Sequence, residues 1–383
     1  MEEYRTYRLG DIAECTLGKM LDQKKNKGKP HVYLGNVAVR WGAFNIDPSQ
    51  TMRFEDKEIE KFQAVKGDII LCEGGEPGRC AIWEDDEPIC IQKALHRIRV
   101  DQSIASPYYV YYYLTSFVKS GKAEPYFTGS TIKHLPRERL ISLELTLPCL
   151  DEQKRRARII QSLDAKISLN NRINHNLEEQ AQALYKSWFI DYEPFKGGRF
   201  VDSELGMIPE GWHVGTLSEL VDVRYGKDHK KLQDGLFPVY GSGGIMRYAE
   251  QALYDKESVL IPRKGSLNNV MYVNHPFWTV DTMFYTIGKI EHTIKYAHLF
   301  LLTQNLASMN AGSAVPSMTT DILNKLVVLI PSESVLNSFD EILSTLYNGI
   351  EERHKECSRL LTTRNVILPK LFSGEVEIDK TSC

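Results

Sequence analysis

The chain has 383 residues, and its hydrophobic fraction of 42% and charged fraction of 25% exclude a disordered chain and allow two or three domains with real cores. Its formal net charge of −3 argues against indiscriminate binding of polyanions but allows a local basic face. No apolar run approaches the roughly 18 residues of a membrane span, and the charged N-terminal residues do not resemble a signal peptide. The seven cysteines lack CxxC spacing, which indicates neither a zinc site nor a disulfide framework and predicts a reduced, cytoplasmic location.

Residues 1–150 are predicted to form a mixed α/β domain. A helix is expected after Ser106, with Pro107 in its first turn, and its tyrosines fit a core better than a base-stacking platform. Short strands punctuated by Gly, Pro and Asp are expected at residues 32–37, 68–72, 80–83, 98–100 and 143–147.

A long helix is predicted at residues 151–190, and a second one at residues 332–375. Both carry a seam of residues spaced alternately three and four apart, which indicates a coiled coil. The first seam comprises Ile160, Leu163, Ile167, Asn170, Asn174, Leu177, Ala181, Leu184 and Trp188. The second comprises Phe339, Leu343, Leu346, Ile350, Arg353, Cys357, Leu360, Arg364, Ile367 and Leu371.

The two seams superpose at an offset of 183 residues (353 − 170), which also aligns the positions where each seam turns polar. The flanking segments match at the same offset, because Gly129-Ser130 falls on Gly312-Ser313 and Pro148 falls on Pro331. Two unrelated surface helices would not share these features. Whole domains are therefore predicted to be duplicated.

The second domain is expected at residues 212–331, after a linker at residues 191–211 that is rich in Gly and Pro, and residues 376–383 form a tail. Its segments repeat the order of the first domain. We pair residues 9–14 with 214–219, 67–71 with 257–261, and 108–114 with 296–302. The predicted fold class is α+β (mixed α/β), with two duplicated globular recognition domains separated by two long helices.

The sequence contains no recognisable catalytic or metal site. The Gly241-Ser-Gly-Gly segment lacks the spacing of a phosphate-binding loop and fits a plain turn, and the acidic residues 84–87 fit a solvated loop. What remains are loops that combine cations with Ser, Asn and Gly, residue types that can contact phosphates and base edges in DNA. The DNA-binding candidates are Arg79, Lys93, Arg97, Ser130, Lys133, Lys227, Lys230, Lys231, Arg263, Lys264, Asn268 and Ser313.

Several of these segments resemble the specificity subunits of Type I restriction-modification systems. Residues 128–135 (TGSTIKHL) and 145–153 (LTLPCLDEQ) resemble the end of a target-recognition domain in that family. Residues 205–212 (LGMIPEGW), 237–244 (FPVYGSGG) and 261–266 (IPRKGS) resemble its second such domain, and residues 369–376 (PKLFSGEV) resemble the end of its second conserved helix. One departure is that the segment after Pro331 lacks the Glu-Gln pair found after Cys149-Leu150.

The resemblance implies a non-catalytic chain that recognises a bipartite duplex DNA target. It further implies two modification subunits, which methylate adenine with S-adenosylmethionine, and restriction subunits that use ATP and Mg. No cofactor or metal is then expected in this chain. The alternatives are a non-DNA coiled-coil scaffold and, less favoured because methyltransferase motifs are missing, a self-contained modification enzyme.

The linker also predicts the direction of the helices. A linker of about 20 residues that is poor in structure does not provide the helix-long return that a parallel pair would need, so an antiparallel coiled coil with a pseudo-twofold axis is expected. Centring the polar layers makes the numbers of facing residues sum to about 527, which places Trp188 opposite Phe339 and Asn174 opposite Arg353. The same register places Leu163 opposite Arg364, which is a poor match.

Overall fold

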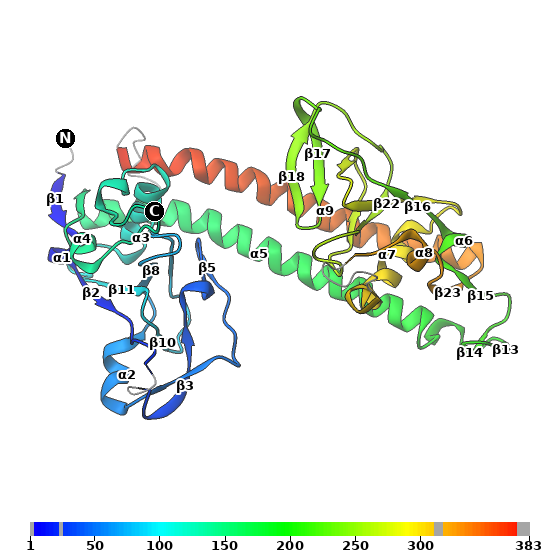
Figure 1. Ribbon diagram of the computed structural model, residues 1–383, viewed down its shortest axis with the longest axis horizontal. Helices are drawn as coiled ribbons and strands as arrows, with labels where there is room; N and C mark the ends of the chain where they lie inside the picture. The colour runs from blue at the N-terminus through cyan, green and yellow to red at the C-terminus, as the bar shows by residue number, and fades with distance from the viewer. Residues whose placement is uncertain (1–3, 23–25, 310–316, 374–383) are drawn as a thin grey trace. The chain divides into compact units, whose positions relative to one another are not determined.

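The computed structural model describes residues 4–22, 26–309 and 317–373, and the chain divides into two units. The first unit contains residues 1–169 and 356–383, and the second contains residues 170–355. The long helices α5 (Leu150–Phe189) and α9 (Glu333–Ser373) each contribute one half to each unit (Figure 1). Within the described ranges, no helix combines the length and apolarity of a membrane span.

The first unit contains short strands and helices that come before α5. Its strands are β1 (Arg5–Arg8), β2 (Ala13–Leu17), β3 (Lys29–Leu34), β4 (Val39–Arg40), β5 (Ala43–Phe44), β6 (Thr51–Phe54), β7 (Gln63–Ala64), β8 (Ile69–Cys72), β9 (Cys80–Ile82), β10 (Ile89–Ile91), β11 (Leu95–Val100) and β12 (Glu144–Leu147). Its helices are α1 (Leu9–Ile12), η1 (Asn36–Ala38), α2 (Asp56–Phe62), α3 (Pro107–Lys119), η2 (Glu124–Tyr126) and α4 (Arg137–Ile141).

The second unit follows a similar order. Its strands are β13 (Phe200–Ser203), β14 (Gly206–Pro209), β15 (His213–Thr216), β16 (Val221–Tyr225), β17 (Asp234–Gly241), β18 (Gly244–Ala249), β19 (Ser258–Pro262), β20 (Met271–Val273), β21 (Trp278–Thr279), β22 (Met283–Gly288) and β23 (Val327–Ile330). Its helices, in addition to parts of α5 and α9, are η3 (Glu193–Phe195), α6 (Leu217–Leu220), α7 (Ile294–Thr303), η4 (Leu306–Met309) and α8 (Thr320–Asn324).

One sheet of the first unit corresponds strand by strand to a sheet of the second. An antiparallel sheet of order β2-β11-β8-β9 in the first unit matches β16-β22-β19-β20 in the second. A second sheet contains one parallel pair in each unit, β3 with β10 and β17 with β21. The shared strand orders confirm the predicted duplication of a mixed α/β domain.

The end of each domain repeats at the predicted offset of 183. The strand β12 begins at Glu144 and β23 at Val327, and the helices α4 and α8 begin at Arg137 and Thr320. The predicted pairing at the start of the domains is wrong by three residues, because α6 begins at Leu217 and matches Leu9 at an offset of 208 (217 − 9). Both residues donate their backbone N–H to the segment before the closing strand, at 2.8 and 2.9 Å. The second domain is shorter than the first between these helices and the closing strands, so the start of the domains pairs at a different offset from their end.

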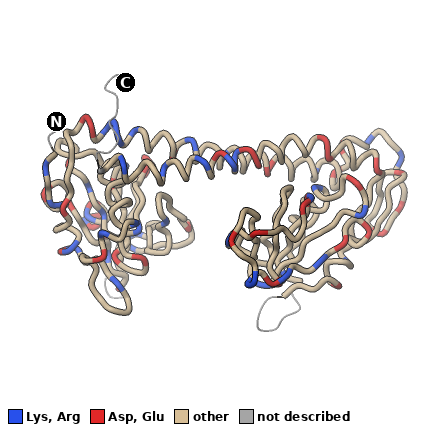
Figure 2. The backbone as a smooth tube through the Cα atoms, turned by 90° about the horizontal axis from the view of Figure 1, so that it is seen from above, with Lys and Arg blue, Asp and Glu red and all other residues tan. Residues whose placement is uncertain are grey.

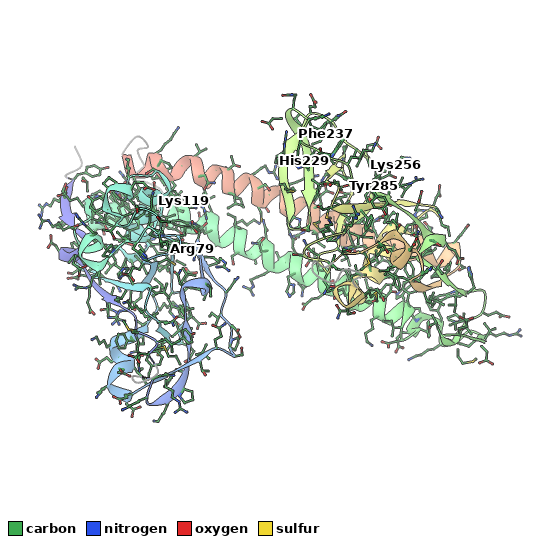
Figure 3. All side chains as sticks on the ribbon, viewed as in Figure 1. Arg79, Lys119, His229, Phe237, Lys256 and Tyr285 are labelled. Carbon is green, nitrogen blue, oxygen red and sulfur yellow. The ribbon has the colours of Figure 1, made fainter. Side chains whose placement is uncertain are left out.

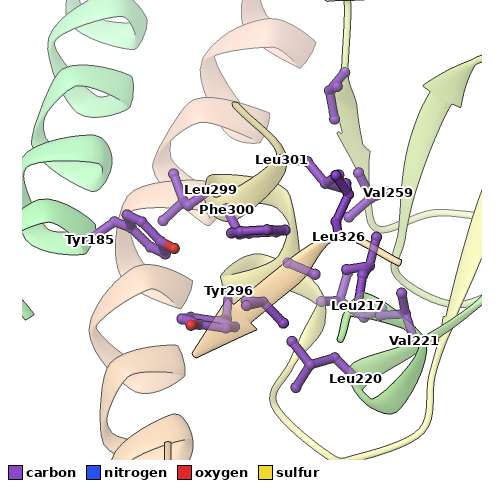
Figure 4. Packing of buried hydrophobic residues seen from close by; sticks show 14 of the residues in the cluster. Tyr185, Leu217, Leu220, Val221, Val259, Tyr296, Leu299, Phe300, Leu301 and Leu326 are labelled. Carbon is purple, nitrogen blue, oxygen red and sulfur yellow. The ribbon is translucent and has the colours of Figure 1, made fainter. Parts of the chain in front are cut away.

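Aromatic residues of the helices lie in the cores, as predicted for α3. Tyr109, Tyr111 and Tyr112 of α3 are buried. In the second unit, Tyr185 from α5 and Tyr296 from α7 lie with their ring centroids 5.6 Å apart, within the largest apolar cluster (Figure 4). Each long helix is therefore part of a domain core, and burial of its aromatic face stabilises it.

The predicted linker is an ordered element. The strands β13 and β14 pair as an antiparallel hairpin between α5 and the second domain. Trp212 and Ile208 are buried in the core of the second unit, and the Phe195 ring lies 4.8 Å from that of Trp212. The segment also contains the short helix η3 and packs on the core, so the prediction of a linker poor in structure is wrong.

The long helices run antiparallel within each unit. In the second unit the rings of Trp188 and Phe339 lie 5.3 Å apart, a pair whose numbers sum to the predicted 527. In the first unit Arg156 donates to the carbonyl of Leu371 at 2.6 Å, and these numbers also sum to 527. The predicted direction and register are confirmed in both units, and all of the predicted seam residues are buried or half-buried.

Candidate nucleic-acid interface

Two equivalent loops join the third and fourth strands of the matching sheets. Residues 73–79 connect β8 to β9, and residues 263–270 connect β19 to β20. Each loop turns at a glycine with positive φ, Gly75 at +76° and Gly265 at +83°, a conformation that side chains with a Cβ rarely adopt. The sequence therefore places a tight glycine turn at the same point of both domains, at an offset of 190 (265 − 75).

A second segment lies against each of these loops. In the first unit the N–H of Leu135 donates to the carbonyl of Glu73 at 2.7 Å. In the second unit the N–H of Met318 donates to the carbonyl of Arg263 at 2.8 Å. Leu135 and Met318 match at the offset of 183 (318 − 135), so the two domains make the same backbone contact to these equivalent loops.

The first domain presents three of its predicted candidates on its surface. Residues Thr128 and His134 exchange backbone hydrogen bonds of 2.8 Å and close a short loop that exposes Ser130 and Lys133. Lys133 forms an ion pair with Glu124. Lys93 is exposed just before β11. These three side chains remain accessible to a nucleic acid, although Lys133 would have to leave its carboxylate partner.

Arg79 is held by neighbouring groups of the first domain. Its guanidinium donates to the Glu76 carboxylate at 2.9 Å and to the carbonyl of Asn36 at 3.0 Å. The same Glu76 accepts a hydrogen bond of 2.6 Å from the indole of Trp41, above whose ring the Lys119 ammonium lies at 4.8 Å. Arg79 and Lys119 thus belong to one polar cluster (Figure 3).

Trp41 and Lys119 were missed by sequence reasoning. Together with Phe127, Ile132 and Lys133 they line a cavity of about 580 Å³ beside the loop at residues 73–79. Burial lowers the pKa of Lys119, and the positive charge of Arg364 lowers it further. No spacing in the sequence signals this cluster, because its members come from four separate segments.

Arg97 is not available to DNA. Its side chain is 2% exposed, and it donates to the backbone carbonyls of Gln63 at 2.9 Å and Lys61 at 3.1 Å, and to the Glu14 carboxylate at 2.6 Å. The prediction of Arg97 as a DNA-binding residue is therefore corrected. Its position in the middle of β11 turns the side chain toward the end of α2, whose last carbonyls need donors.

A basic loop in the second domain exposes Lys227, Lys230 and Lys231. It is anchored by backbone groups, because Lys227 N–H donates to the Thr279 carbonyl at 2.9 Å and its own carbonyl accepts from the Trp278 indole at 2.9 Å. His229, in the same loop, and Phe237, on β17, are labelled in Figure 3. The three lysines are exposed on a loop with an anchored backbone, which suits contact with phosphates.

The loop at residues 263–270 carries the other candidates of the second domain. The Arg263 guanidinium lies 5.3 Å from the ring centroid of Tyr225, an exposed residue that sequence reasoning missed. Lys264 is exposed. Asn268 is exposed but engaged, since its side chain accepts from the Ala307 N–H at 2.8 Å. Ser313 lies outside the described residues.

Positively and negatively charged residues are interspersed along the backbone of each unit (Figure 2). Binding of a polyanion would therefore depend on individual loops, such as the lysine loop at residues 227–231, and on the local field of those loops. This pattern agrees with the near-neutral charge of the whole chain.

The buried cysteines of the first unit are poorly suited to nucleophilic chemistry. Burial raises the pKa of the Cys15 and Cys80 thiols to about 12 and that of Cys90 to about 11, so these groups stay protonated and are poor nucleophiles. Among the residues that the structure describes, no three His, Cys, Asp or Glu side chains come close enough to hold a metal ion. The Gly241-Ser-Gly-Gly segment forms the turn between β17 and β18, as predicted.

The fold and the loops together define a class of protein, in which a recognition domain is duplicated and each copy is followed by a long helix. The family model described as "Type I restriction modification DNA specificity domain" matches this chain twice, at residues 1–179 and 209–357. The chain belongs to this family. It is the specificity subunit of a Type I restriction-modification system.

Relatives in other organisms agree with this assignment. The chain is 26% identical over 345 residues to the Type I restriction enzyme MjaIX specificity subunit of Methanocaldococcus jannaschii, covering 82% of this chain and 79% of that protein. It is 20% identical to the HindI specificity subunit of Haemophilus influenzae, covering 98% and 100%. The crystal structure of the S subunit from M. genitalium, 19% identical, covers 99% of this chain and 97% of its own with a TM-score of 0.61, which shows the same fold.

Proposed function

We propose that each of the two domains of this chain recognises one half of a bipartite duplex DNA target. The observation that carries the proposal is the duplicated loop pair with diverged side chains. Two positions of the loops show the divergence. Glu73 of the first domain corresponds to Arg263 of the second, and Glu76 corresponds to Ser266. A similar backbone turn with different side chains is what two half-sites of different sequence require.

The two long helices would set the gap between the half-sites. A helix of 40 residues, the length of α5, is about 60 Å long at 1.5 Å per residue. Half-sites on one face of B-DNA lie about 34 Å apart for each helical turn. A coiled coil of this length is sufficient to hold two domains over about one turn of duplex.

The chemistry of modification and cleavage would then belong to partner subunits. Modification subunits, two in number, would use S-adenosylmethionine to methylate adenine, and restriction subunits would use ATP and Mg. This chain would act in the cytoplasm, without a catalytic residue or cofactor of its own. The support for this part is membership of the family and the relatives named as specificity subunits of restriction enzymes.

Exchange of one domain tests the division of the target. Residues 1–150 are replaced by the first domain of a relative, and methylated adenines are mapped in host DNA before and after the exchange. Only one half-site is expected to change, because the two domains have separate apolar cores and separate loops. A change in both halves at once would show that recognition is shared between the domains.

A further inference from the structure

The hairpin formed by β17 and β18 exposes four large apolar side chains. The exposed fractions are 87% for Leu236, 50% for Ile245, 60% for Met246 and 51% for Tyr248. The hairpin itself is firmly held, because its residues Val239, Tyr240 and Ala249 are buried in an apolar cluster of the second unit. A rigid element that keeps several apolar groups in water is typical of a contact surface.

Cationic loops lie at both ends of this hairpin. At its turn, the Asn269 amide donates to the carbonyl of Ser242 at 2.8 Å, which holds the loop carrying Arg263 and Lys264 against the hairpin. At its open end, the Arg247 guanidinium donates to the carbonyl of Leu232 at 2.9 Å, which holds the end of the basic loop. The four exposed apolar residues of the hairpin, Leu236, Ile245, Met246 and Tyr248, are called the apolar strip below. The strip is flanked by Arg263 and Lys264 at one end and by Lys227, Lys230 and Lys231 at the other.

The acidic residues beside the strip are engaged in the protein. Asp234 forms an ion pair of 2.9 Å with Arg247, and the Asp228 carboxylate accepts a hydrogen bond of 3.1 Å from the Lys230 N–H. Positive charge on either side of an apolar centre fits a duplex groove, where phosphates flank the edges of the bases. A protein partner with an entirely apolar surface would make no favourable contact with these cations.

The hairpin is also the place where the two domains differ most. The offset between them falls from 208 at α1 and α6 to 190 at the glycine loops, so the second domain is 18 residues shorter in between (208 − 190). In the first domain the equivalent strands β3 and β6 are joined by residues 35–50, whereas β17 and β18 are joined by a two-residue turn. A contact made by this hairpin would therefore be particular to the second half-site.

We propose that the β17–β18 hairpin enters the major groove and that Ile245, Met246 and Tyr248 read the C5-methyl groups of thymine, while the flanking loops hold the phosphates. The major groove, about 12 Å wide, admits a two-stranded β-ribbon, and apolar contact with the thymine methyl is one of the direct base contacts available there. This inference rests on the proposed function. It adds that the half-site read by the second domain contains thymine.

The test uses the full chain, purified together with the subunits that accompany it, and a selection from random duplex DNA to define the preferred site. Binding is then measured by fluorescence anisotropy at one salt concentration, on the selected duplex and on a duplex with uracil in place of thymine in each half-site. The hairpin variants are Met246→Ala, Ile245→Ala and Tyr248→Ala. Met207→Ala is the matched control, because Met207 is 51% exposed on a different hairpin, β13–β14.

Uracil lacks only the methyl group of thymine, so each contacted position should cost wild type and Met207→Ala about fourfold in affinity in one half-site. Met246→Ala should bind more weakly on thymine DNA and respond less to uracil, since the contact is already lost. Circular dichroism is expected to show the same fold for all variants, because the substituted residues are exposed.

Three results would overturn the inference. Equal sensitivity of the wild type and all hairpin variants to uracil would show that the hairpin does not read thymine. Unchanged DNA affinity with loss of the accompanying subunits would make the hairpin a protein contact. A wild-type preparation that selects no duplex at all would instead reject the proposed function, and this inference would be rejected with it.

Discussion

Arg97 and Lys264 show, at the scale of single residues, why a cation in a strand or loop must be judged by its surroundings. Both stand in sequences that suggest contact with phosphates. Arg97 donates its hydrogen bonds to carbonyls and a carboxylate of its own domain, and it holds the end of α2 in place. Lys264 is exposed at a glycine turn and keeps its ammonium in solvent. Only the second is available to neutralise a phosphate.

The substitution Lys264→Ala is expected to weaken binding to all duplexes alike. A lysine that contacts a phosphate releases about one counterion, so the slope of log affinity against log salt should decrease by about 1. Titrations between roughly 50 and 200 mM salt measure this slope. Lys256→Ala is the control, since Lys256 is exposed before β19, at the end of the strand opposite to Lys264. An equal loss of slope in both variants would contradict a specific contact.

His298 is expected to make the stability of the second unit depend on pH. Its Nδ1 lies 2.6 Å from the hydroxyl of Tyr347, and burial lowers the pKa of His298 to about 4, although a hydrogen bond with the backbone of Val270 favours the protonated form. The unfolded chain, with a pKa near 6.5, binds more protons between about pH 6.5 and 4. Unfolding free energy should thus be highest above pH 6.5 and fall by up to about 3 kcal/mol as the pH decreases to 4.

Urea titrations at pH 7, 6 and 5 check this dependence. The variant His298→Gln keeps a polar side chain but has no group that titrates in this range. Its unfolding free energy should therefore fall less than that of the wild type over the same interval. Identical pH dependence in the two proteins would assign the effect to other groups, such as the carboxylates.

At the scale of elements, an ion pair compensates for a charged residue in the seam of the coiled coil. Arg364 occupies a seam position opposite Leu163, where an unpaired charge would be costly. Its guanidinium donates to the Asp164 carboxylate at 2.6 Å, and the hydroxyl of Tyr112 in α3 donates to the same carboxylate at 2.9 Å. The charged pair therefore joins both long helices to the first domain.

Removal of this carboxylate should destabilise the first unit, and removal of the whole pair should destabilise it less. Asp164→Ala leaves the Arg364 guanidinium and the Tyr112 hydroxyl without their acceptor and should lower the free energy of unfolding by about 1 kcal/mol, because both charged groups are partly solvated. In the double variant Asp164→Ala/Arg364→Leu, a leucine faces Leu163 and part of the stability should return, because only the Tyr112 hydroxyl still lacks its acceptor. Chemical unfolding of the two variants measures the difference. A double variant weaker than the single one would show that the pair itself is the stabilising element.

At the scale of the whole molecule, the two units repeat one topology with separate cores, and both long helices run through both units. The residues at the junction, Asn170 and Glu356, lie within continuous helix. The chain therefore passes from one unit to the other through helix rather than through a loop. This arrangement is the physical basis for expecting the helices to act as a ruler.

An insertion of four residues near Asn170 is expected to change the gap of the target and leave both half-sites as they are. Four residues lengthen one helix by roughly 6 Å, which corresponds to about one or two base pairs once tilt is considered. Mapping of methylated adenines in cells that carry the inserted chain measures the gap directly. An altered half-site with an unchanged gap would mean that the domains find their spacing by another contact.

The sequence alone determined the features that depend on period and repetition. The seam of alternating spacing predicted both long helices to within a few residues, and the offset of 183 predicted that domains are duplicated. A short connection predicted the antiparallel direction. The helices and their direction could be predicted because helical periodicity and the length of a connection depend on residues that are close together in the sequence. The duplication could be predicted because a repeat is found by comparing two segments of the same sequence directly.

The tertiary structure alone decided which side chains are accessible to solvent and which side chains contact one another. Arg97 is buried, whereas Trp41 and Lys119 meet beside Glu76, and the apolar strip of the β17–β18 hairpin lies between two cationic loops. The physical reason is that burial and proximity depend on contacts between distant segments. The sequence alone does not distinguish a cationic residue that donates to a carbonyl in the core from one that is exposed and can contact a phosphate.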